Sequence, residues 1–156
     1  MRLSILLAAI FAATTISPLA APAADHQHMV FRAIRRSDDS LLVSLLRQGV
    51  PIDLRVAGGA TPLSYAALWS DADKLELLLE HGADPNLSDD QGATALLLGA
   101  GSLEKVRLLL AAGADPNARS NLGNTPLIAA AAYPQSKRVV ELLLEHGAEA
   151  DTSNNR

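Results

Sequence analysis

Residues 59–86 read GATPLSYAALWSDADKLELLLEHGADPN, and two further stretches of the chain repeat this pattern. Residues 92–117 read GATALLLGAGSLEKVRLLLAAGADPN, and residues 123–150 read GNTPLIAAAAYPQSKRVVELLLEHGAEA. A degenerate copy, VFRAIRRSDDSLLVSLLRQGVPID, begins at Val30. Self-similarity at a period of about 33 residues is typical of proteins that are built from stacked repeats.

Each copy carries a glycine at the end of its leucine-rich part, and these glycines lie 33, 31 and 34 residues apart. From each of the first three glycines to the threonine that opens the next copy, the distance is 12 residues. A loop of constant length beside a helical part of variable length indicates units that stack in register. The glycines are Gly49, Gly82, Gly113 and Gly147, and the threonines are Thr61, Thr94 and Thr125.

Local signals predict a pair of helices in each copy. Thr61-Pro62 places a capping hydroxyl before a proline at the first helical position, and the small pair Ala66-Ala67 predicts a thin first helix. The second helix carries a Leu-Leu-Leu run and ends at a glycine suited to the left-handed conformation. Because one copy cannot bury its leucine face alone, the predicted fold is an all-α solenoid of about four helix pairs.

These motifs resemble the ankyrin repeat family, whose copies begin with Thr-Pro-Leu and close with Leu-Leu-x-x-Gly-Ala-Asp. The resemblance implies short β-hairpin fingers between the helix pairs. The repeats would span about residues 26–57, 58–90, 91–121 and 122–151. The later copies look similar to exported bacterial ankyrin proteins. The resemblance implies a protein–protein interaction module without catalytic activity or cofactor, which acts as a scaffold, inhibitor or stabiliser of another exported protein.

The first residues predict an export signal that is removed from the mature protein. Arg2 precedes an apolar run from Leu3 to Ala13, which is shorter than the roughly 20 residues that span a bilayer. Ala21-Pro22-Ala23 matches a cleavage pattern, so we expect residues 1–23 to be a cleaved signal peptide and residues 24–156 the repeat domain. We therefore expect a periplasmic or secreted protein without a membrane span. The alternative is a buried N-terminal helix of the domain.

Composition excludes several classes of function. The 156 residues contain no cysteine, which excludes disulfides, thiolate metal sites and a cysteine nucleophile. With 13 Lys and Arg against 17 Asp and Glu, the net charge is −4, which argues against a nucleic acid partner. His81 and His146 precede glycines that end helices, and Asp84 and Asp115 lie in turn motifs, so these residues do not predict an enzyme.

An alternative function rests on the mature N-terminus. A cut after Ala23 yields the sequence Ala24-Asp25-His26. A free amine, two backbone amides and a third-position imidazole can hold Cu(II) or Ni(II) in a square plane. The chain would then be a metal-handling or enzyme-accessory factor. The competing interpretation is a frayed polar tail without a metal.

In the family that the chain resembles, partners dock on the inner ends of the first helices and on the finger tips. The third copy passes directly from Ala100 to Gly101 and lacks two inner positions, so we expect a notch between Trp69 and Tyr133. The alternative is that Trp69 fills the core. The expected protein-binding residues are Arg35, Arg36, Leu68, Trp69 and Tyr133 on the inner face, with Arg55, Asp89, Asp90, Arg119 and Asn121 as a polar rim.

The last predicted helix, Val139 to His146, reads VVELLLEH, and ten residues follow it. Solenoids commonly finish with a repeat whose outer face is polar, and this helix does not fit that pattern. We therefore expect Val140 and Leu143 or Leu144 to be partly exposed. The C-terminal repeat would then support weak self-association.

Overall fold

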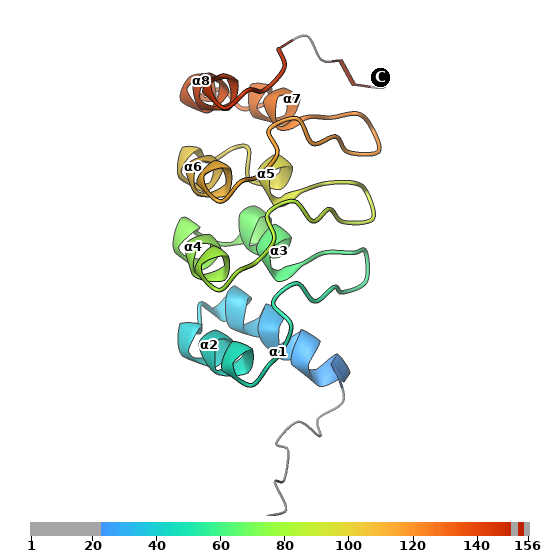
Figure 1. Cartoon of the computed structure of the whole chain (residues 1–156), viewed down its shortest axis with the longest axis vertical. Coiled ribbons are helices and arrows are strands. Elements are labelled where there is room, and N and C mark those ends of the chain that lie inside the picture. The colour runs from blue at the N-terminus through green and yellow to red at the C-terminus, as the bar shows by residue number, and fades with distance from the viewer. Residues whose placement is uncertain (1–22, 151–152, 155–156) are drawn as a thin grey trace, which may run out of the picture.

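The computed structural model of the chain describes residues 23–150 and 153–154, which form stacked pairs of helices. In Figure 1 the first helices of the pairs form one column and the second helices another, and the fingers project from the side of the first helices. The pairs are α1 (Ala23–Arg36) with α2 (Asp39–Arg47), α3 (Pro62–Trp69) with α4 (Ala72–Glu80), α5 (Ala95–Leu98) with α6 (Leu103–Ala111), and α7 (Pro126–Ala131) with α8 (Lys137–Glu145). The predicted all-α solenoid is confirmed.

Threonines cap the first helices of the last three pairs, as their spacing predicts. The side-chain oxygen of Thr61 accepts a hydrogen bond from the backbone N–H of Ser64 at 3.1 Å, and Ser64 Oγ accepts one from the N–H of Thr61 at 2.9 Å. The side-chain oxygens of Thr94 and Thr125 cap α5 and α7 by accepting from the backbone N–H groups of Leu97 and Ile128. Because a capping hydroxyl satisfies an otherwise free helix amide, each cap contributes about 1 kcal/mol and fixes where its helix begins.

Glycines in the left-handed conformation follow the second helices. Their φ angles lie between +85° and +87°, a region that side chains with a Cβ disfavour. This conformation ends each helix and directs the chain toward the next finger. The four glycines are Gly49, Gly82, Gly113 and Gly147.

The core runs through the whole stack as rows of equivalent residues. One leucine from each second helix is almost completely buried, with an exposed fraction of 2% or less, and burial of such a side chain contributes about 1.5–3 kcal/mol. Buried alanines in the first helices allow neighbouring helices of that column to approach closely. The leucines are Leu45, Leu78, Leu109 and Leu143, and the alanines are Ala33, Ala66 and Ala130.

The fingers are tight loops with little strand character. Within the described part of the chain, one isolated antiparallel bridge is found, between Ser88 and Thr94. Each finger closes with one equivalent backbone hydrogen bond, for example from the Asp89 N–H to the Ala93 carbonyl at 3.0 Å. The predicted hairpin shape is therefore present in a minimal form.

Two first helices depart from the common length. The helix α5 has four residues where α3 has eight, in agreement with the two-residue deletion in the third copy. The helix α1 has 14 residues and begins at Ala23, so residues 24–28 are helical and do not form a frayed tail. Gln27 Nε2 donates to the Arg55 carbonyl at 3.1 Å, which ties the start of α1 to the first finger.

The predicted signal peptide lies outside the described residues except for Ala23. Its cleavage and the export of the protein stay predictions. Among the helices that the structure describes, none is long and apolar enough to cross a membrane.

Candidate protein-binding surface

Large apolar side chains are exposed at the inner ends of the first helices. The exposed fractions are 46% for Leu68 and 71% for Trp69 at the end of α3, and 48% for Tyr133 just after α7. Trp69 therefore does not fill the core, and that alternative is wrong. Aromatic side chains with this exposure supply large contact areas when a partner covers them.

A notch opens beside these residues where α5 is short. It is a pocket of about 220 Å³, and its lining includes Leu68 and Tyr133. Trp69 does not line it, so the expectation that Trp69 forms one wall is wrong, and Leu68 forms that wall instead. A Cβ atom added to Gly101 would lie 2.8 Å from the Tyr133 ring, so this ring covers Gly101 and depends on its missing side chain. The other lining residues are Ala67, Leu98, Gly99, Ser102 and Lys105.

Arg35 and Arg36 lie in the last turn of α1 and are exposed. Counting back from the closing glycines, they occupy the positions that Leu68 and Trp69 occupy in the second repeat. The predicted inner-face residues therefore lie at equivalent ends of first helices. Arginine beside exposed aromatic residues is a composition that protein interfaces favour.

The predicted polar rim has structural roles within the stack. Arg55 Nη1 donates to the Ser88 carbonyl of the next finger at 2.7 Å, and Arg119 Nη2 donates to the Ser153 carbonyl at 2.7 Å. Asn121 Nδ2 donates to the Asp90 carbonyl at 3.0 Å. Asp89 Oδ1 accepts hydrogen bonds from two amides of its own turn. A role for these residues in partner binding stays a prediction.

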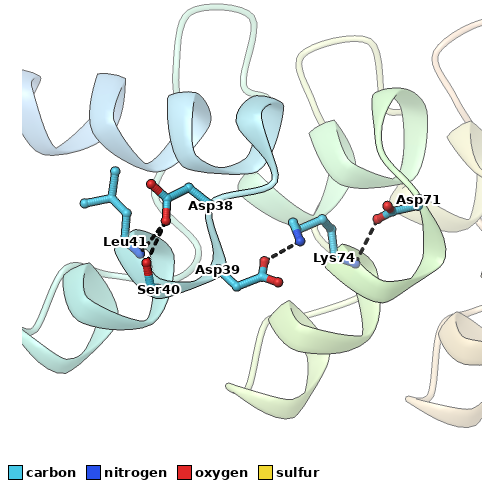
Figure 2. A network of polar contacts seen from close by, with 6 residues as sticks. All are labelled: Asp38, Asp39, Ser40, Leu41, Asp71 and Lys74. Carbon is cyan, nitrogen blue, oxygen red and sulfur yellow. Dashed lines mark hydrogen bonds and ion pairs between the residues drawn. The ribbon is translucent and has the colours of Figure 1, made fainter.

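Two lysines outside the predicted binding residues link neighbouring repeats. Lys74 is 4% exposed, and its ammonium pairs with the Asp39 carboxylate (Figure 2). At the equivalent position in α6, Lys105 Nζ donates to the Ala67 carbonyl at 2.7 Å. Burial lowers the pKa of Lys105, and the carboxylate of Asp71 acts in the opposite direction. The signal in the sequence is a lysine three residues after the cap in both copies.

The acidic residues of the turns accept hydrogen bonds from nearby amides, and the histidines lie against carbonyl oxygens at helix ends. Asp84 Oδ1 accepts a hydrogen bond from the Asn86 N–H at 2.9 Å, and Asp115 does the same for Asn117. His81 Nδ1 lies 2.8 Å from the Leu77 carbonyl oxygen at the end of α4. These contacts agree with the structural roles expected from the sequence.

The predicted metal-binding residues Ala24, Asp25 and His26 lie in the first turn of α1. Successive amides of a helix point along its axis, so this turn would have to unwind before the two amides could converge on one metal ion. In the part of the chain that the structure describes, no group of three or more His, Cys, Asp or Glu side chains could hold a metal. Metal binding stays a prediction that requires cleavage after Ala23.

The C-terminal repeat exposes part of its apolar surface. Leu144 is 42% exposed and Val140 is half-buried, whereas Leu143 is fully buried in the leucine row. The expectation of partial exposure therefore holds for Val140 and Leu144.

Comparisons with known proteins agree with this architecture. The family model for ankyrin repeats (3 copies) matches residues 30–120 and 100–155. The 2-5A-dependent ribonuclease of Homo sapiens is 39% identical over 79 residues, which are 50% of this chain and 11% of that protein. The ankyrin repeat, SAM and basic leucine zipper domain-containing protein 1 of Ornithorhynchus anatinus is 42% identical over 60 residues, which are 38% of this chain and 13% of that protein.

The match therefore spans little more than a tenth of the length of these relatives. Both relatives are eukaryotic proteins. The resemblance to exported bacterial proteins stays a prediction.

Proposed function

The chain belongs to the ankyrin repeat family, and from this premise we propose that it is a non-catalytic module that binds another protein through its inner face. Here the inner face means Arg35, Arg36, Leu68, Trp69 and Tyr133. We further propose that the protein is exported and acts as a scaffold, inhibitor or stabiliser of a partner in the periplasm or outside the cell.

The exposure of Trp69 is the observation that carries the proposal. An indole that is 71% exposed forfeits most of the free energy that its burial would contribute, and Leu68 is exposed beside it. A partner that covers both side chains would recover this free energy at the point where the inner face is most apolar. Trp and Tyr are among the residues most enriched in the energetic centres of interfaces.

The experiment identifies the partner first and then measures its affinity. A photo-crosslinking amino acid replaces Trp69 in the exported protein, and the crosslinked partner is identified by mass spectrometry. The same amino acid at Leu144, which is exposed on α8, serves as the positional control. N-terminal sequencing of the exported protein tests cleavage after Ala23 in the same preparation.

With the partner identified, Trp69→Ala is expected to weaken its binding by about 2 kcal/mol or more. The melting temperature is expected to change little, because the indole makes few contacts within the fold. Leu144→Ala is expected to leave the affinity unchanged. Should Trp69→Ala unfold the chain, or leave the affinity intact, the inner face is not the docking surface.

A further inference from the structure

The lining of the notch combines apolar side chains with one cationic group. Leu68, Leu98 and the Tyr133 ring provide apolar surface, and Lys105 and the hydroxyl of Ser102 provide polar groups. The volume of about 220 Å³ is enough for one side chain of a partner. A pocket of this kind selects the occupant by the charge of its wall.

Lys105 differs from Lys74 in the group of the preceding repeat that its ammonium contacts. Lys74 pairs with Asp39, the first residue of α2. The residue equivalent to Asp39 in the second repeat is Ala72, the first residue of α4, which offers no carboxylate to Lys105. Lys105 instead donates to the Ala67 carbonyl at the notch wall. Among the described residues, Lys74 therefore forms an ion pair, whereas Lys105 donates to a neutral carbonyl oxygen.

The ammonium of Lys105 has hydrogen-bonding capacity beyond the bond to Ala67. An ammonium has three donors, and a carbonyl oxygen uses one of them. The carboxylate of Asp71 lies near enough to act on Lys105, yet its Oδ1 caps α4 by accepting from the Lys74 N–H at 3.3 Å. Partial burial makes an anionic partner more favourable for this cation than it is for a lysine in bulk water.

We propose that the notch receives the side-chain carboxylate of a Glu or Asp residue of the partner protein, and that Lys105 binds it. This inference rests on the proposed function of the inner face. Residues of the partner next to that acid are apolar and pack on Leu68 and Trp69. The exposed guanidinium groups of Arg35 and Arg36 lie on the same face and favour an acidic segment.

The test begins with a display library of short random peptides that is selected on the purified chain. The expected peptides carry Glu or Asp next to apolar residues. For the peptide that binds most tightly, affinity is measured with its original Glu or Asp residue and with that residue replaced by Gln or Asn. Each form is measured against the unchanged chain and against Lys105→Met.

The four affinities form a double-mutant cycle. We expect Lys105→Met and the amide peptide each to weaken binding about tenfold or more, and the two changes together to cost little more than one. Lys105→Arg keeps the charge and is expected to retain most of the affinity. Lys137→Met, at a lysine whose side chain is 87% exposed, is expected to change the affinity by less than about twofold.

The outcomes separate this inference from the proposed function. If binding requires Trp69 but the losses from Lys105→Met and from the amide peptide simply add, the inner face binds partners and the notch does not recognise a carboxylate. If acidic peptides bind with the expected coupling while Trp69→Ala has no effect, the notch is a carboxylate-binding site. The proposal that the whole inner face docks a partner is then wrong. A library without any binder overturns both. The melting temperature of each variant verifies that it is folded.

Discussion

The junction between the first two repeats differs from the junction between the second and third. At the first, Asp53 Oδ1 accepts one hydrogen bond, from the Asp84 N–H at 3.1 Å. At the second, Asn86 makes two: its Oδ1 accepts from the Asp115 N–H at 2.8 Å, and its Nδ2 donates to the Gly113 carbonyl at 3.0 Å. A carboxylate has no hydrogen to donate, so Asp53 can offer nothing to the carbonyl of Gly82.

The contacts of the second helices also differ between the two junctions. The first junction has the ion pair between Asp39 and Lys74, whereas the second has the neutral acceptor of Ala67 for Lys105. Equivalent lysines therefore join neighbouring repeats either through an ion pair or through a hydrogen bond to a neutral carbonyl oxygen. Because repeats contact only their neighbours, such choices set the strength of each junction separately.

The largest expected effect is at the second junction. Asn86→Ala removes two hydrogen bonds between repeats and is expected to lower the free energy of unfolding by about 1–3 kcal/mol. Asp53→Ala removes one and is expected to cost about half as much. Equilibrium unfolding in urea measures both values, and equal costs would contradict the comparison.

Hydrogen exchange locates the Asn86→Ala effect. The Asp115 amide, which donates to Asn86 Oδ1, is expected to exchange faster in this variant. Asn117→Ala is the matched control, since it affects the Glu149 amide at the third junction. Faster exchange at Asp115 in Asn117→Ala would mean that the junctions are not separate.

Breaking the ion pair tests the first junction. Asp39→Asn leaves the ammonium of Lys74, which is 4% exposed, without its carboxylate. We expect a loss of about 1–2 kcal/mol, below the range for fully buried pairs because the Asp39 side chain is 58% exposed. Asp73→Asn, at an exposed acid in the first turn of α4, is expected to cost a few tenths of a kcal/mol.

The reverse experiment converts the first junction toward the second. Asp53→Asn supplies the missing donor for the Gly82 carbonyl and keeps the acceptor for the Asp84 N–H. We expect the free energy of unfolding to rise by about 0.5–1.5 kcal/mol, the net contribution of one hydrogen bond. An unchanged or lower stability would show that the amide does not reach the position that Asn86 occupies at the second junction.

The stack could be predicted from the sequence because its signals act over short distances. A threonine cap and a left-handed glycine depend on residues within one helical turn, so Thr61 and Gly82 define their helix ends without reference to other repeats. The notch followed in the same way from a two-residue deletion. The Tyr133 wall was predicted as well, and the Tyr133 ring packs over Gly101 of the neighbouring repeat. The opposite wall was not predicted, because the orientation of α3 in the stack decides that Leu68 and not Trp69 lines the notch.

The roles of the long polar side chains could not be predicted from one copy at a time. Arg55 is a charged residue of a finger, so the sequence predicts it as part of an exposed polar rim. Its guanidinium instead binds the backbone of the next finger. Lys74 and Lys105 occupy equivalent positions of their repeats. Their partners differ because the second helix of the preceding repeat begins with Asp39 in one case and with Ala72 in the other. Such roles are set by contacts between repeats.

The smallest expected effect concerns the cap of α2 in the first repeat. Hydrogen bonds from the Leu41 N–H and from the Ser40 hydroxyl (Figure 2) hold the pKa of Asp38 below its usual value of 3.8. The charge of Arg32 lowers this pKa further. Because the folded state lowers this pKa, the ionised carboxylate stabilises the fold above pH 3.8. That contribution is lost as the pH falls through the pKa of the folded state.

Asp38→Asn isolates this charge, since an asparagine can still accept the hydrogen bond from Leu41. Above about pH 5, we expect the unchanged chain to be more stable than the variant by a constant amount. The difference shrinks as the pH falls below 3.8 and levels off below the pKa of the folded state, where both side chains are neutral. Urea unfolding at a series of pH values measures it. A difference that stays the same across this range would mean that the cap stabilises the first repeat through its hydrogen bonds alone, as a neutral cap does.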